Sequence, residues 1–169
     1  SVTDTGGVHF VPAFVGLGSP HWEAEARGTV TGLTRGTTRA HLVRAALEAM
    51  AFSSAELVEL MRDDARLGAG ALRVDGGASA NDWLMQFLAD ALGAPVERPD
   101  MFETTALGAA GLAGITLGIW RDTAQFLEGR RLTRCAPAST EEERRRGREG
   151  WDRAVHAALA WARFERREP

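Results

Sequence analysis

The chain has 169 residues, 44% of them apolar, and a formal net charge of −3, which is typical of one soluble globular domain or part of one. This balance argues against a nucleic-acid partner, and no apolar run approaches the roughly 20 residues that span a bilayer. All 20 basic residues are Arg, which excludes a Schiff-base Lys and a GK[ST] phosphate loop on this chain. The single cysteine, Cys135, excludes an internal disulfide, and we expect a reducing, cytoplasmic location.

Two strands are predicted near the start of the chain. Residues 8–15 are rich in β-formers, but Pro12 cannot donate to a ladder, so this strand is expected at an edge or with a bulge. Residues 28–33 alternate in the manner of a second strand. Between them, residues 16–20 form a turn rich in Gly and Pro.

A long amphipathic helix follows the second strand. Thr37 or Thr38 is its expected N-cap, and apolar residues recur with a helical period over about 26 residues. At 1.5 Å per residue, such a helix is roughly 40 Å long and must be a major packing element. Gly68 and Gly70 are expected to end it.

The stretch from residue 71 to residue 82 is the most informative part of the chain. Residues 71–75 predict a short buried strand, which runs directly into Gly76 and Gly77. Ser79 is the predicted N-cap of the next helix, with Asp82 three residues later in the capping-box position. The sequence therefore predicts a strand, a glycine turn and a helix in immediate succession.

Two interpretations of this turn stay open. Glycine has no Cβ and accepts a positive φ, so a ligand can lie against bare backbone, and the helix start offers unpaired N–H groups that suit phosphate. The alternative is an ordinary tight turn between strand and helix. Asp75 is open in the same way, because it either acts as a catalytic base or orders the turn by accepting backbone N–H bonds, the role we favour.

The remaining elements are a helix of small residues and a long terminal helix. Residues 103–114 contain many Gly and Ala residues, and because Gly is costly inside a helix, a close approach to a neighbour or a ligand is expected. Residues 122–138 predict a short amphipathic piece and an irregular connector. The last helix runs from Ser139 or Thr140 to about Arg163, and its arginine run 144–146 is interpreted as a solvated face paired with preceding glutamates. The fold class is therefore α/β.

Five blocks in order resemble the glycerol kinases of the FGGY carbohydrate kinase family. Residues 10–22 resemble PAFxGLGAPYW, and residues 27–37 resemble ARGxxxGLTRGT. Residues 72–81 resemble the adenosine-site turn of kinases with the actin/Hsp70/hexokinase fold. Residues 103–108 resemble ETTALG, and residues 114–120 resemble the end of the AGLAxGxW block. The resemblance covers nearly the whole chain.

This sequence departs from the family pattern at a few mild positions. Ser19, His21 and Glu23 stand where Ala, Tyr and Asp are usual, and Ser79 and Asp82 stand where Val and Asn are usual. None of these changes removes the paired glycines or the Asn that follows them. His21, Glu23 and Glu25 are candidate metal ligands on one loop, but three polar residues in a loop are weak evidence, and solvent-facing side chains are the favoured interpretation.

The resemblance implies a partial ribonuclease H-like/actin-like ATPase domain, with a mixed sheet and flanking helices. It implies that residues 1–169 are the later, nucleotide-binding part of the second domain, and that the N-terminal domain is absent. The implied reaction transfers phosphate from ATP, bound with Mg²⁺, to glycerol, giving glycerol 3-phosphate and ADP. Gly76, Gly77 and Asn81 are the implied nucleotide-binding residues, and the helix with Gly108 is expected to pack behind them. No catalytic residue and no metal ligand is assigned on this chain.

Other functions remain open from the sequence. The chain is expected to be catalytically incomplete alone, because the family's catalytic aspartate, its glycerol-binding residues and its phosphate-gripping hairpin precede the matched region. A kinase of the same family for xylulose or gluconate is one alternative. The other is a non-catalytic assembly or binding fragment, and unpaired sheet edges predict a homo-oligomer.

Overall fold

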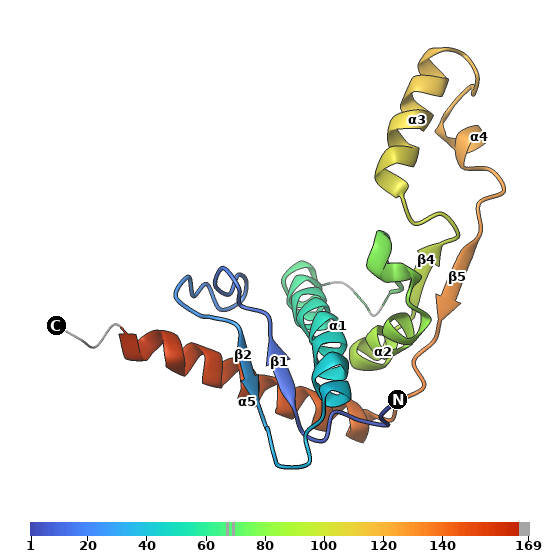
Figure 1. Cartoon of the computed structure of the whole chain (residues 1–169). Helices are drawn as coiled ribbons and strands as arrows, with labels where there is room; N and C mark the ends of the chain where they lie inside the picture. Colours follow the sequence, from blue (N-terminus) through green and yellow to red (C-terminus); the bar gives the residue numbers. More distant parts are fainter. Residues whose placement is uncertain (67, 69, 166–169) are drawn as a thin grey trace.

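The computed structural model describes residues 1–66, 68 and 70–165, and Figure 1 shows how their elements are arranged. In chain order these are β1 (His9–Val11), β2 (Thr29–Thr31), α1 (Arg39–Ala65), β3 (Leu72–Arg73), the 3₁₀ helix η1 (Gly77–Ala80), α2 (Asp82–Leu92), β4 (Val96–Pro99), α3 (Thr104–Thr116), α4 (Thr123–Leu127), β5 (Leu132–Cys135) and α5 (Glu141–Glu165). The alternation of strands and helices that the sequence predicts is confirmed.

The long helix α1 begins and ends at identifiable backbone signals. Thr38 is its N-cap, and the His41 side chain accepts a hydrogen bond from the Thr38 backbone N–H at 3.0 Å, as in a capping box. The helix ends at Ala65, and its C-cap, Arg66, has a left-handed backbone with φ 52°. The prediction that Gly68 and Gly70 end this helix is therefore wrong, because a non-glycine residue takes the left-handed position before either glycine is reached.

Helix α1 separates two hydrophobic clusters, so it is the central packing element. On one side, Phe52 packs with β1 and α5, and its ring stacks on Trp151 at a centroid distance of 5.7 Å. On the other side, Ala51 and Ala55 pack against Leu88 of α2 and the strand β4. Small alanines on α1 allow this close approach on both faces, and burial of the surrounding apolar surface stabilises the fold at about 25 cal/mol per Å². The position of α2 is therefore fixed by α1.

The three-stranded sheet, in the order β3–β4–β5, is mixed and leads into the turn at Gly76 and Gly77. Strand β3 pairs in parallel with β4, Leu72 opposite Val96, and β4 pairs antiparallel with β5, Val96 opposite Cys135. The mixed sheet with flanking helices is confirmed. The strand β5 lies within residues 122–138, which the sequence predicted as a connector, and its exposed Leu132 and Thr133 explain why no burial pattern signalled it.

Helices α3 and α4 form an arm that extends away from α1 and α2 (Figure 1). The two buried glycines of α3 face aromatic rings of the returning chain: Gly111 faces Phe126, and Gly114 faces Trp120. A Cβ on either glycine would overlap the ring, whereas a Cβ on Gly108 would meet nothing within 4 Å. The two buried glycines therefore accommodate these rings, whereas the space beside Gly108 is open.

The terminal helix α5 confirms the interpretation of the arginine run. Arg145 and Arg146 both contact Glu142 on the exposed face, at 2.7 and 2.8 Å. Arg144 instead folds back to donate to the carbonyl of Ser139 at 2.7 Å. The run is a self-paired helix surface, which contributes only modestly to stability.

Within residues 1–66, 68 and 70–165, no helix has the length and apolarity that crossing a bilayer requires.

The glycines of α3 provide a matched pair of substitutions. We expect Gly108→Ala to raise the free energy of unfolding of the arm by up to about 1 kcal/mol, because Ala favours the helix and the site is open. Gly114→Ala should lower it, since the new methyl group overlaps the Trp120 ring. Chemical unfolding followed by tryptophan fluorescence measures both, and equal effects would refute this account of α3.

His9 makes stability depend on pH. Burial against α5, and then the nearby positive charge of Arg153, lower the pKa of His9 below its ordinary value of 6.5. The unfolded chain therefore binds the proton first, so the free energy of unfolding falls as the pH drops from 6.5 toward the lowered pKa. We expect His9→Gln to flatten that fall in urea unfolding between pH 7.5 and 5. His156→Gln, at an exposed histidine of α5, is the control, and equal slopes for wild type and His9→Gln would contradict the prediction.

Candidate functional site

The paired glycines lie where β3 ends and the chain turns toward α2. The backbone N–H of Val74 still donates to Glu97 across the sheet at 2.9 Å, so pairing with β4 continues almost to the turn. Gly76 then takes φ 83° and ψ 171°, a conformation that residues with a Cβ rarely adopt. Its N–H donates to the carbonyl of Phe102 at 2.9 Å. The turn is thus anchored to the segment that follows β4.

Ser79 orders the interior of the turn. Its N–H and its hydroxyl both donate to the carbonyl of Gly76, at 3.0 and 2.7 Å, and the residue is 2% exposed. The prediction that Ser79 caps α2 in a capping box with Asp82 is wrong. A 3₁₀ turn over Gly77–Ala80 precedes α2, and the serine hydroxyl donates to the carbonyl of Gly76 within that turn. Sequence spacing alone does not distinguish that turn from the first turn of an α-helix.

Asn81 is the N-cap of α2. Its side-chain oxygen accepts a hydrogen bond from the N–H of Leu84 at 3.1 Å, and its backbone is extended with φ −82° and ψ 105°. Because the carbonyl oxygen is engaged in the cap, the side-chain NH₂ is the group left to donate to a ligand. Asn81 therefore has a structural role as a helix cap, which the sequence pattern did not predict.

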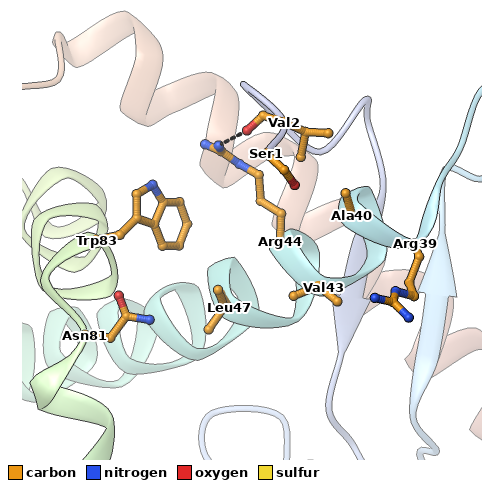
Figure 2. A pocket seen from close by; sticks show the side chains of 9 residues that line it. All are labelled: Ser1, Val2, Arg39, Ala40, Val43, Arg44, Leu47, Asn81 and Trp83. Carbon is orange, nitrogen blue, oxygen red and sulfur yellow. Dashed lines mark hydrogen bonds between the residues drawn. The ribbon is translucent and has the colours of Figure 1, made fainter.

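A hollow of about 470 Å³ lies beside Asn81, between α2 and the first turns of α1 (Figure 2). Its walls include Trp83 of α2 and Val43 and Leu47 of α1, and Arg44 sits with its guanidinium 4.9 Å from the Trp83 ring centroid. Arg44 is already paired with Glu48 at 2.8 Å. The hollow therefore offers apolar walls with the Asn81 amide at one edge.

The main chain at the paired glycines is open. A Cβ placed on Gly76 or on Gly77 would meet no described atom within 4 Å, so there is open space beside both residues. On the side of α1, Ala78 and Ser79 line a second hollow of about 140 Å³, together with Met50 and Ser54. A ligand can therefore approach the glycine backbone, which is what a site for a phosphate-bearing ligand requires.

Asp75 does not order the turn. Its side chain is exposed, and within the described part of the chain its carboxylate accepts no hydrogen bond. The expectation that Asp75 holds the turn through backbone N–H groups is therefore wrong, because Ser79 and the carbonyl of Phe102 take that role.

The acids and the histidine of the first loop have separate structural partners. His21 contacts Glu56 of α1 at 3.1 Å, Glu23 is buried at 7% exposure, and Glu25 pairs with Arg27. Among the described residues, no three His, Cys, Asp or Glu side chains are grouped so that they would hold a metal ion. The expectation of solvent-facing side chains is wrong for Glu23.

Trp22 in the same loop is 79% exposed and has a left-handed backbone with φ 48°. Within the described chain it belongs to neither hydrophobic cluster, so it does not act as a packing anchor there.

One residue at the turn was missed by the sequence analysis. Arg98 of β4 donates to the carbonyl of Ser79 and to the carboxylate of Asp82. Its side chain is only 12% exposed. The residue stands between Glu97 and Pro99 in a short strand, and no periodicity or motif marks it, so only the tertiary structure reveals its position.

The N-cap gives a test at Asn81. We expect Asn81→Ala to lower the free energy of unfolding by about 1 kcal/mol, because the N–H of Leu84 loses its acceptor. Asn81→Asp keeps an acceptor oxygen and should retain most of the stability. Urea unfolding followed by circular dichroism measures both variants, and an unchanged midpoint for Asn81→Ala would remove the cap from this account.

Comparison with known proteins shows which family the chain belongs to. Residues 1–117 match the C-terminal domain of the FGGY family of carbohydrate kinases. The glycerol kinase of Burkholderia ambifaria is 54% identical over 163 residues, 96% of this chain and 33% of that protein. The glycerol kinase of Pseudothermotoga lettingae is 53% identical over 162 residues, 95% of this chain and 32% of that protein. The chain thus spans about one third of the length of these curated relatives.

Solved structures agree with this match. The crystal structure of Plasmodium falciparum glycerol kinase with ADP is 36% identical, with a TM-score of 0.81, over 94% of this chain and 32% of that one. A xylulose kinase from Rhodospirillum rubrum is 25% identical, with a TM-score of 0.74, over 96% of this chain and 33% of that one. On sequence and on structure, the chain belongs to the FGGY family of carbohydrate kinases, and its residues 1–117 match the C-terminal domain of that family.

Proposed function

We propose that this chain supplies the nucleotide-binding side of a glycerol kinase, which transfers phosphate from ATP to glycerol. The observation that carries the proposal is the identity of 53–54% with glycerol kinases over 95–96% of the chain. The structural match to a glycerol kinase with ADP supports it independently. Kinases for xylulose and gluconate share the fold at 22–25% identity, so glycerol is the favoured substrate.

The turn at the paired glycines is the proposed point of contact with ATP and ADP. Gly76 and Gly77 have open space where a Cβ would stand, so phosphate or ribose oxygens approach their backbone closely. The NH₂ group of Asn81 faces the larger hollow and donates to the adenine or the ribose there. Apolar walls from Val43, Leu47 and Trp83 suit the faces of a purine ring.

Phosphoryl transfer depends mainly on positioning and electrostatics, so the substrates of such a kinase are held from several sides. The proposed share of this chain is to hold the nucleotide. The base that takes the proton from the glycerol hydroxyl, and the residues that bind glycerol, are assigned to the part of the kinase that precedes the matched region. The described residues offer no ligand cluster for Mg²⁺, so no step is assigned to the ion here.

A chimera tests the proposal. The chain would replace the matching third of the Burkholderia ambifaria glycerol kinase, and we expect the product to phosphorylate glycerol in a coupled assay. Gly77→Val in the chimera should raise the KM for ATP roughly tenfold or more, because its side chain occupies the space of the nucleotide. The KM for glycerol should change little.

Gly70→Val is the matched control, because Gly70 is also open to solvent and lies away from the turn. The 169-residue chain alone is expected to show no turnover. The proposal is contradicted if the folded chimera is inactive, if the chain alone is active, or if Gly77→Val and Gly70→Val leave the KM for ATP equally unchanged.

A further inference from the structure

Arg98 reaches the turn from the neighbouring strand. It lies on β4, opposite Thr133 of β5, and most of its side chain is buried. One terminal nitrogen of its guanidinium donates to the carbonyl of Ser79, near the end of the turn, and the other donates to the carboxylate of Asp82, in the first turn of α2. A single side chain thus ties the turn to the start of the next helix.

Phe102 completes this support. The guanidinium carbon of Arg98 lies 5.6 Å from the centroid of the Phe102 ring, within cation–π range. The backbone carbonyl of Phe102 accepts the N–H of Gly76 at 2.9 Å. Arg98 and Phe102 together therefore contact the turn at both of its ends.

The turn depends on such outside support, because its own side chains are small. Residues 77–80 are Gly, Ala, Ser and Ala, and Ser79 is the buried member of the turn. Because such small side chains make few packing contacts, the position of this backbone is set by the neighbouring residues Arg98 and Phe102. Binding groups need support of this kind to stay within a fraction of an ångström of the productive geometry.

Arg98 also offsets an unfavourable charge. Asp82 lies in the first turn of α2, where its carboxylate faces the same end of the helix that a phosphate would approach. The two are like charges, and although the Asp82 side chain is 86% exposed, its ion pair with Arg98 offsets part of the repulsion. Arginine suits this position better than lysine, because its rigid fork donates to two acceptors at once.

We propose that Arg98 is a positioning residue of the nucleotide site, holding the turn Gly77–Ala80 where its backbone meets the phosphate-bearing ligand. The inference rests on the proposed function, and it deepens it by naming the side chain that sets the geometry of the turn. Arg98 touches no ligand in this account. It acts through Ser79, Asp82 and Phe102.

Calorimetric titration of the purified 169-residue chain with ADP tests the proposal. We expect Arg98→Ala to raise the Kd for ADP by roughly tenfold or more, since two hydrogen bonds from a charged donor are lost. Arg98→Lys should fall between wild type and Arg98→Ala, because an ammonium group reaches one of the two acceptors. Arg134→Ala is the matched control, since Arg134 forms an exposed ion pair with Glu97 on the same sheet.

The fitted stoichiometry separates positioning from simple loss of folding. A substitution that only destabilises the fold lowers the fraction of chain that binds and leaves the Kd of the folded fraction unchanged. A raised Kd at unchanged stoichiometry, with the intermediate Arg98→Lys value, supports the proposal. A wild-type Kd for both Arg98 variants overturns it, whatever their stoichiometry.

Gly77→Val distinguishes this inference from the proposed function. If wild type binds no ADP, or if Gly77→Val binds as wild type does, the nucleotide site is not at the turn, and both proposals fail. If Gly77→Val loses binding and the Arg98 variants keep the wild-type Kd, the inference on Arg98 alone fails.

Discussion

The structure depends on one backbone constraint: the chain must leave β3 and enter α2 within a few residues, at a place that packing has already fixed. Strand β3 is held in parallel against β4, and α2 is held against α1 by a buried apolar cluster. Between them Gly76 turns with φ 83°, a region that side chains strongly disfavour. The open backbone at the glycines is therefore a consequence of how the two elements are connected.

This connection places the candidate site on a rigid support. In α/β folds, ligands bind outside the carboxyl ends of parallel strands, and the turn follows such an end at β3. On the side of α2 that faces α1, Trp83 stacks on Phe87 at 5.1 Å, and Phe87 meets Phe52 of α1 edge-on at 5.4 Å. Aromatic packing thus runs from the wall of the larger hollow into the main core, so the wall has little freedom to move.

The sequence predicts elements with a strong local signal and misses those that depend on tertiary contacts. The helical period and Thr38 locate α1, and the paired glycines locate the turn, because both signals are local. The N-cap of α2 is Asn81 rather than Ser79, since the serine hydroxyl is used inside a 3₁₀ turn that spacing does not reveal. Arg98 escapes prediction for a related reason: its partners lie 16 and 19 residues away, and only pairing of β3 with β4 brings them together.

The central claim is that a purine nucleotide lies against the main chain of the paired glycines. The most direct measurement is an ADP titration of the ¹⁵N-labelled chain, followed by the backbone amide signals in NMR spectra. The account predicts that the largest saturable shifts of the amide signals fall on residues 76–81, which form the turn and the N-cap of α2. Saturable shifts confined to other elements, such as α5 or the α3–α4 arm, with the amides of Gly76 and Gly77 unmoved, would contradict it.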